Sequence, residues 1–293
     1  MHNTTGHPTV SAAAQRHRAA VRARLSRSPI QRAGPGSITW TINREVIVVV
    51  GWGRAILLQL AHPAVAAGVH HHSAFRGSLR AGVRRLQSTV GAMLSLTFGD
   101  TEQMIATAAT INTIHDRVLG PTYAANDPDL QQWVHATLVD SIPRAYEMLV
   151  GPLTCEERDR YCSEAAIMEP LLGMPPHLLP RDSHHLDAYI RDMHSGGRLV
   201  VTDGSRALAR AVLYPPHWQV AWPAFRAMQV LTIGSLPPSL RDAYGFEWHS
   251  RDERAFARWT TMLRTTRRLL PPPAREWPMA RRRTALTVGS APT

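Results

Sequence analysis

Residues 100–120 read DTEQMIATAATINTIHDRVLG and carry the clearest helical pattern in the chain. Asp100 is followed by Gln103 at the spacing of a capping box, which predicts a helix N-terminus. Gly120 and Pro121 predict the end of this helix. One face repeats at helical spacing and consists of Met104, Ala108, Ile111, His115 and Val118. Every member of this face is apolar except His115.

His115 has two interpretations. A lone histidine on a buried helical face is commonly a core residue that hydrogen-bonds to its neighbours. A neutral imidazole is also a frequent metal ligand. The helix alone leaves both interpretations open, and the segment before it bears on the choice.

The length and composition predict one large domain or two small ones, with basic ends. The chain has 293 residues, of which 44% are hydrophobic, so it is long enough to bury a substantial core. Residues 1–44 contain seven arginines and no acid, and residues 264–293 contain seven arginines and one acid. Because the body between them is nearly neutral, the net charge of +11 does not predict a nucleic-acid-binding domain.

The expected domain organisation follows from this distribution of charge and apolar residues. We expect a disordered basic tail over residues 1–36 and another over residues 279–293, on either side of a single helical domain at residues 37–278. The basic tails could contact an anionic membrane surface through their arginines.

Several chemistries are excluded by residue content. All 33 basic residues are arginine, which excludes Schiff-base lysines and P-loop lysines. Cys155 and Cys162 would lie about 10 Å apart on one helix, too far for a disulfide, so they are interpreted as reduced residues of a cytosolic protein. The N-terminal residues lack the apolar core of a secretory signal, and the expected location is cytoplasmic.

Within the most apolar part of the chain, residues 37–75, the segment 46–69 has the length of a membrane span but contains Arg54, Gln59 and His62. We therefore expect a buried helix pair, with a break where His62 precedes Pro63. Its first residues, VIVVVGWG, resemble a strand that enters a dinucleotide-binding turn. That reading is rejected because the third glycine and the later ribose-binding acid are both missing.

A second polar pair interrupts an apolar face in the next predicted helix, residues 79–96. Arg85 and Thr89 are four residues apart and share a face with Met93. Arg85 either lies at the surface beside Arg84 or is buried with an anion, because an unpaired buried guanidinium is strongly unfavourable. Residues 46–99 contain no acid, so an interior partner from this segment would have to be a bound anion.

The fold class expected from these patterns is all-α. No alternation of period two persists over several segments, and helical patterns continue through the second half of the chain. A buried-face histidine, an arginine–threonine face and an acid-free apolar helix pair together suit a planar apolar cofactor that carries carboxylates, such as haem. The imidazole would bind iron, and the guanidinium would contact a propionate or dioxygen.

A set of motifs in fixed order adds a family resemblance. They are GPGSITWTINREV from residue 34, RAILLQLAHPAVAAGV from residue 54, HSAF from residue 72, RRLQST from residue 84, HDRVLGPTYAANDP from residue 115, WVHATL from residue 133 and LPPSLRDAYGFEW from residue 236. Together they resemble the MpaB-type and rubber oxygenase (latex clearing protein) family over residues 34–278.

The resemblance implies a globin-like helical core that binds haem b and reacts dioxygen with carbon–carbon double bonds. It makes His115 the proximal iron ligand and places Arg85 and Thr89 on the distal side. Rubber oxygenases have a lysine just before that threonine, and here the position is Ser88. The family's acid–base glutamate has no clear counterpart, and His72 and its neighbour at 71 lie nearest in the chain.

The expected function is therefore that of a cytoplasmic b-haem oxygenase that acts on a small apolar, isoprenoid or other alkene substrate with dioxygen. His62 and His135 are secondary candidates for the cofactor site. Two alternatives remain open: a haem-binding sensor or carrier without turnover, and a haem-free helical binding module. Neither a nucleic-acid partner nor a transmembrane segment is expected.

Overall fold

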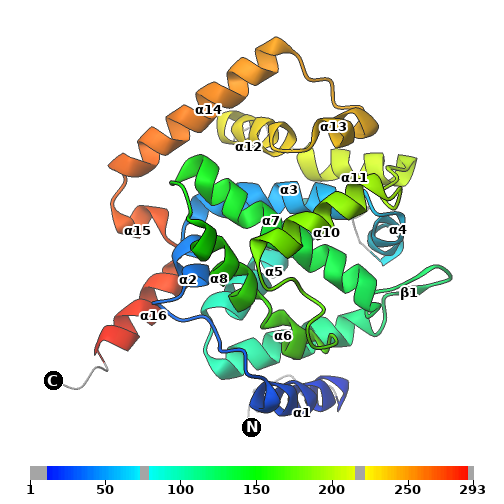
Figure 1. Ribbon diagram of the computed structural model, residues 1–293, viewed down its shortest axis with the longest axis vertical. Helices are drawn as coiled ribbons and strands as arrows, with labels where there is room; N and C mark the ends of the chain where they lie inside the picture. Colours follow the sequence, from blue (N-terminus) through cyan, green and yellow to red (C-terminus); the bar gives the residue numbers. More distant parts are fainter. Residues whose placement is uncertain (1–11, 73–78, 215–221, 290–293) are drawn as a thin grey trace, which may run out of the picture.

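The computed structural model describes residues 12–72, 79–214 and 222–289, and nearly all of their secondary structure is helical (Figure 1). The elements are α1 (Ala12–Arg27), α2 (Ile38–Asn43), the 3-10 helix η1 (Val46–Val48), α3 (Val49–Leu60), α4 (Pro63–His72), α5 (Leu79–Phe98), α6 (Thr101–His115), β1 (Leu119–Gly120), β2 (Tyr123–Ala124), α7 (Pro128–Leu149), α8 (Cys155–Ala165), α9 (Met168–Leu172), α10 (Ser183–Ser195), α11 (Asp203–Leu213), α12 (Trp222–Gly234), α13 (Pro238–Tyr244), α14 (Ser250–Leu269), α15 (Pro272–Arg275) and α16 (Pro278–Gly289). The prediction of a single all-α domain is confirmed, and a globin-like arrangement stays a prediction.

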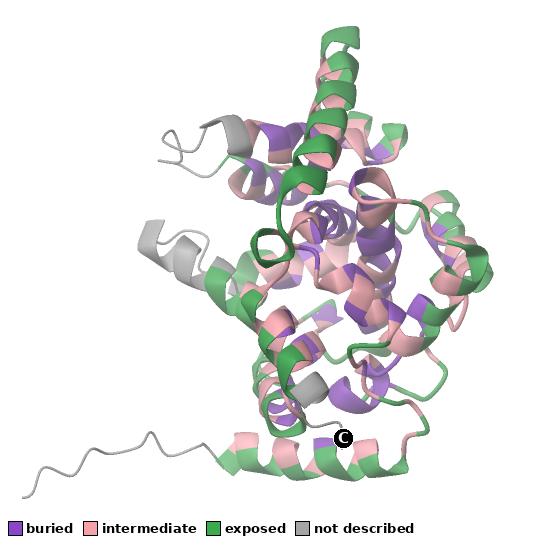
Figure 2. Cartoon of the chain, turned by 90° about the vertical axis from the view of Figure 1, so that its left-hand side faces the viewer, coloured by how far each residue is buried: buried purple, intermediate pink, exposed green. Residues whose placement is uncertain are grey.

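Helices α3 and α7 pack against each other at the centre of the molecule (Figure 1). Gly51 allows the close approach, because a Cβ at this position would lie 2.6 Å from the carbonyl oxygen of Ser141. Nε2 of Gln59 donates hydrogen bonds to the carbonyl oxygen of Val134 at 3.2 Å and to Oγ1 of Thr137 at 3.1 Å. Figure 2 shows buried residues concentrated in these central helices.

The remaining helices surround this pair. Helix α12 packs on α3, and α14 covers α12 on the outside. Helices α8 and α10 pack against α7. Helices α5, α6 and α1 lie at the other end of the molecule from α12 and α14 (Figure 1).

Helix α1 differs from the expected mobile tail over residues 1–36. It packs along α6 and contacts α9, and Val21 is fully buried there. Nε of Arg24 donates to the carbonyl oxygen of Pro170 at 2.8 Å, and Arg22 forms an ion pair with Glu102 at 2.8 Å. The arginine-rich composition was misleading because Val21, the partly buried Leu25 and hydrogen bonds to carbonyl acceptors on α9 hold an otherwise polar helix. Residues 1–11 of the predicted tail lie outside the described residues.

The C-terminal segment is also helical where residues 279–293 were expected to be disordered. Ala280 in α16 is only 1% exposed, and Trp277 stacks on Trp52 with ring centroids 6.1 Å apart. Buried Glu45 accepts two hydrogen bonds from Arg267, at 2.8 and 2.5 Å. These contacts attach the C-terminal helices to α3 and to the segment before it. Residues 290–293 lie outside the described part.

The apolar segment after residue 45 forms helices, as expected. It begins with η1 and continues as α3, so the rejection of a strand and dinucleotide-binding turn is confirmed. The predicted break at His62 separates α3 from α4, with a bend of 102°. Within the described chain, no single helix is long and apolar enough to span a membrane. The bent pair of η1–α3 and α4 is the one described segment that reaches this length and apolar character when its two parts are counted together.

Candidate functional site

His115 is the last residue of α6, five residues earlier than the expected helix end at Gly120. The N-terminal capping box is present as predicted: the amide of Gln103 donates to Asp100 at 2.8 Å, and the reciprocal bond is 2.9 Å. Helix α6 stops early because residues 116–118 form a turn that leads into the β1–β2 hairpin, whose pairing is incompatible with helical backbone. The hairpin therefore sets what lies beside His115.

The imidazole of His115 is partly buried and incompletely paired. Its Nδ1 is buried and has no hydrogen-bond partner within the part of the chain that the structure describes. Burial lowers the pKa of His115, while the charge of Asp116 and the side chain of Asn126 act in the opposite direction. A neutral imidazole with a free buried nitrogen is the form that binds a metal.

Asp116, the residue after His115, has a contact to each oxygen of its carboxylate. Nδ2 of Asn126 donates to Oδ1 of Asp116 at 2.9 Å. Nε2 of His17, from α1, lies 2.7 Å from Oδ2 of the same carboxylate. Asp116 thereby connects α1, the end of α6 and the segment before α7, and the contacts fix the orientation of the backbone at His115.

His135, on α7, is the second histidine of this region. Burial, together with the smaller effect of the nearby His115, lowers its pKa to about 4. Asp127 caps α7 by accepting from the amide of Asp129 at 2.9 Å, which positions the helix from its first turn. The structure thus brings together two predicted site residues from separate helices, His115 and His135.

His62 lies at the bend between α3 and α4. Its Nδ1 is buried and, among the described residues, has no hydrogen-bond partner. Burial lowers the pKa of His62, Arg198 lowers it too, and Asp127 acts in the opposite direction. His62 therefore lies near the start of α7, and its ring is neutral at pH 7 like those of His115 and His135.

The β1–β2 hairpin joins α4 to the end of α6, a contact that sequence reasoning missed. Tyr123 is 8% exposed, and its hydroxyl lies 3.0 Å from Nδ1 of His71. A Cβ at Gly68 would lie 3.4 Å from the Tyr123 ring, and one at Gly120 would lie 2.4 Å from it. Only glycine at 120 leaves room for this ring, so the glycine interpreted as a helix stop instead accommodates Tyr123.

The predicted distal residues are described incompletely. Arg85 and His72 belong to α5 and α4, but their side chains lie outside the described part of the structure. Thr89 is exposed on α5, so it borders solvent rather than a packed interior. The distal roles of these three residues stay predictions.

A buried ion-pair network joins α3 to α7 on the other side of the core. Arg54 is 6% exposed and pairs with Asp140, which is 4% exposed and also accepts from Nε of Arg144 at 2.6 Å. Arg54 donates to Oγ of Ser141 at 2.7 Å and to the carbonyl oxygen of Ser235 at 2.9 Å. In the sequence Arg54 was only an argument against a membrane span, since its partners are distant along the chain.

One further group of metal-ligand side chains lies on the surface. Ligand atoms of Asp182, His184 and His185 lie within 4.8 Å of one another at the start of α10. Asp182 caps the helix by accepting from the amide of His185 at 2.8 Å, and Nδ1 of His185 lies 2.7 Å from the same carboxylate. These contacts explain the cluster as a helix cap, and it is separate from His115 in the chain and in the fold.

Comparison with known proteins gives the family. The uncharacterized proteins Rv2237 of Mycobacterium tuberculosis and Mb2261 of Mycobacterium bovis are each 26% identical to this chain over 224 residues, which is 74% of this chain and 87% of theirs. No solved structure matches. The model of one family, described as "ER-bound oxygenase mpaB/B'/Rubber oxygenase, catalytic domain", matches residues 39–265, most of the helical domain. The chain therefore belongs to the MpaB and rubber oxygenase catalytic-domain family.

Proposed function

We propose that this protein is a b-haem-dependent oxygenase that acts on a small apolar alkene, with His115 as the iron ligand. The observation that carries the proposal is His115 itself: a neutral imidazole with a buried Nδ1 that lacks a partner among the described residues. A buried unpaired nitrogen is costly, and coordination or a hydrogen bond to a ligand would remove that cost. Membership of an oxygenase family supports the chemistry.

The residues around His115 suit this role. His135 and His62 have lowered pKa values and are neutral at pH 7, so neither places a positive charge beside a metal. Asp116, held by Asn126 and His17, fixes the end of α6 and thereby the direction of the imidazole. A bound haem would supply the redox-active iron for dioxygen chemistry, and apolar residues of α6 would exclude water from that face.

The spectrum of the purified protein tests the proposal. The wild-type chain should show a Soret band, either as purified or after addition of haem. His115→Ala should lose haem or shift this band, whereas His70→Ala, at an exposed position on α4, should leave it unchanged. A wild-type protein that stays colourless with added haem would favour a haem-free binding module. An unchanged spectrum in His115→Ala would refute the ligand assignment.

Turnover separates the oxygenase from a haem sensor or carrier. We expect oxygen uptake when a candidate alkene is added to the haem-loaded protein, and its absence over a panel of alkenes would contradict an enzymatic role. Arg85→Ala should reduce the rate per bound haem by about 10²–10³ if Arg85 stabilises developing negative charge. Arg84→Ala is the matched neighbour and should turn over normally, so the reverse pattern would overturn the distal assignment.

A further inference from the structure

One cavity lies far from His115, between α11, α12 and the segment that connects α13 to α14. Its volume is about 590 Å³, which is in the range of small-molecule sites. Figure 1 places these helices at the opposite end of the molecule from α6. The proposed oxygenase site does not include any of the residues that line this cavity.

One wall of the cavity is apolar and held in place. Trp248 donates its indole N–H to Glu253 at 2.6 Å, and the guanidinium of Arg241 lies 4.8 Å from its ring. The edge of Phe256 also contacts Trp248, with ring centroids 6.3 Å apart. Three contacts on one side chain make a rigid aromatic surface, which is a favourable wall for an apolar ligand because little side-chain entropy is lost on binding. Ile233 from α12 extends this wall.

Three arginines line the cavity: Arg226 on α12, the helix that also carries Ile233, Arg251 at the start of α14, and Arg210 on the facing helix α11. Arg226 and Arg251 lie 3.8 and 3.7 Å from the same carboxylate, that of Asp252. Asp252 also accepts a hydrogen bond from the amide of His249 at 3.1 Å, so its charge interacts with two guanidinium groups and one amide. Arg210 lines the same cavity and is exposed, and the structure gives its guanidinium no ion pair within the described chain. The carboxylate of Asp252 therefore forms ion pairs with two of the three arginines that line the cavity, Arg226 and Arg251.

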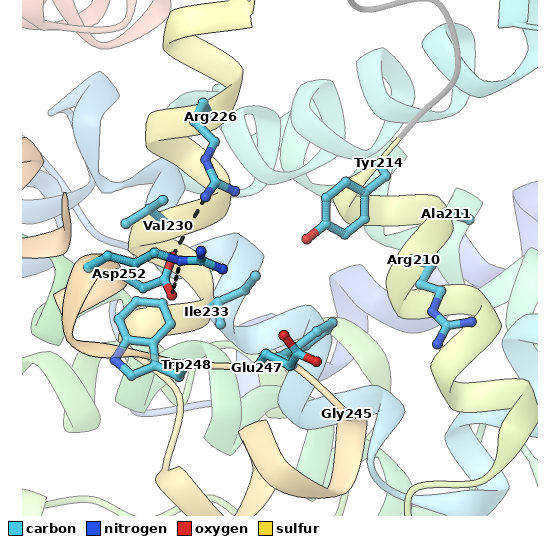
Figure 3. Close-up of a pocket in the computed structure, with 12 residues that line it drawn as sticks. Arg210, Ala211, Tyr214, Arg226, Val230, Ile233, Gly245, Glu247, Trp248 and Asp252 are labelled. Carbon is cyan, nitrogen blue, oxygen red and sulfur yellow. Dashed lines mark ion pairs between the residues drawn. The ribbon is translucent and has the colours of Figure 1, made fainter.

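Figure 3 shows how Tyr214, Arg226 and Glu247 face the space between α11 and α12. Tyr214 from α11 and Arg226 from α12 approach it from facing sides, and Glu247 lies below them. A hydroxyl and a guanidinium on facing walls can bind the two oxygens of one carboxylate. Glu247 is a second anionic group near this position, so a ligand with a single negative charge is better tolerated than a doubly charged phosphate.

We propose that this cavity binds an amphipathic carboxylate, a molecule with an apolar body and a single carboxylate group. The body lies against Trp248 and Ile233, and the carboxylate lies between Arg226 and the hydroxyl of Tyr214. The site is independent of the proposed oxygenase function, since it uses different helices and different residues. It gives the protein a second ligand class beside any apolar substrate.

Titration calorimetry on the full chain tests the site with decanoate, decanol and decylamine, which share one alkyl chain and differ in charge. Decanoate should bind at least about tenfold more tightly than the other two, the equivalent of one charge-assisted hydrogen bond. Arg226→Gln should weaken decanoate binding by about tenfold, and Glu247→Gln should strengthen it because a repelling charge is removed. Arg254→Gln, an exposed arginine of α14 that does not line the cavity, is the charge-matched control and should leave binding unchanged.

Each other result counts against the proposal. Equal binding of decanol and decanoate would show that the arginines do not select the ligand. Preference for decylamine, with weaker binding in Glu247→Gln, would reassign the cavity to a cationic ligand. A loss in Arg254→Gln equal to that in Arg226→Gln would mean that net charge, and not this cavity, attracts decanoate. Circular dichroism of each variant should show that the fold is retained.

Discussion

Removal of Asp140 should be among the most destabilising single changes in the protein. Asp140→Leu leaves the guanidinium of Arg54 buried, with side-chain exposure of 8%, and without its carboxylate partner. Breaking a buried pair in this way costs about 3–5 kcal/mol. With an unfolding entropy of about 2.1 cal/mol/K per residue, this corresponds to a fall in Tm of about 5–8 °C for a chain of this length. Urea unfolding followed by circular dichroism measures the loss.

A double variant tests whether the unpaired charge of Arg54 causes the loss of stability in Asp140→Leu. Arg54→Met combined with Asp140→Leu replaces both charges by apolar side chains of similar size. We expect the free energy of unfolding to fall much less in this double variant than in Asp140→Leu alone. Arg144→Met is the control: its side chain is 54% exposed, so loss of its ion pair should cost about 1 kcal/mol or less. A loss below about 1 kcal/mol in Asp140→Leu, or additive losses in the double variant, would refute the account of a buried charge pair.

The ion pairs of Asp140 with Arg54 and Arg144 also predict how the stability of the protein changes at acidic pH. Burial by itself raises the pKa of Asp140, but the charges of Arg54 and Arg144 overcome it, so the pKa lies below its usual value of 3.8. A carboxyl with a lowered pKa stabilises the fold fully above its unfolded pKa, and this contribution is lost as the pH falls through the folded pKa. The stability difference between wild type and Asp140→Leu should therefore shrink only below about pH 4.

Three further predictions concern other parts of the fold. The partly buried, neutral His135 should make the haem-free protein lose stability as the pH falls from about 6.5 to about 4, because only the unfolded chain takes up the proton. Urea unfolding at several pH values measures this loss, and a similar loss in His135→Phe would contradict the explanation. Val21→Ala should cost about 1–3 kcal/mol through the α1–α6 contact, and a thermal melt identical to wild type would show that α1 is not docked. Gly51→Ala should destabilise by about 1–3 kcal/mol because its Cβ meets the backbone of α7. Gly91→Ala, with open space around its Cβ, should stabilise by about 0.5–1 kcal/mol, and equal effects of the two glycine substitutions in thermal melts would count against the close packing of α3 on α7.

Local sequence determined the features that depend on neighbouring residues. The capping box at Asp100 and Gln103 and the break at His62 follow from short-range hydrogen bonding and backbone sterics, and the structure has both. Helical periodicity and the lack of sustained alternation predicted the all-α fold. The ordered motifs identified the family, because they span nearly all of the domain that the family model matches.

Tertiary structure decided the features that depend on residues distant in the chain. Composition suggested that residues 12–27 were a free tail, and only their packing on α6 and α9 makes them a docked helix. The same is true of Arg54, whose partner Asp140 is 86 residues away, and of His135, whose pKa depends on burial and on His115. Periodicity reports which face of a helix is apolar, but the partner of that face is set by how the whole chain packs, and burial and charge pairing are properties of that packing.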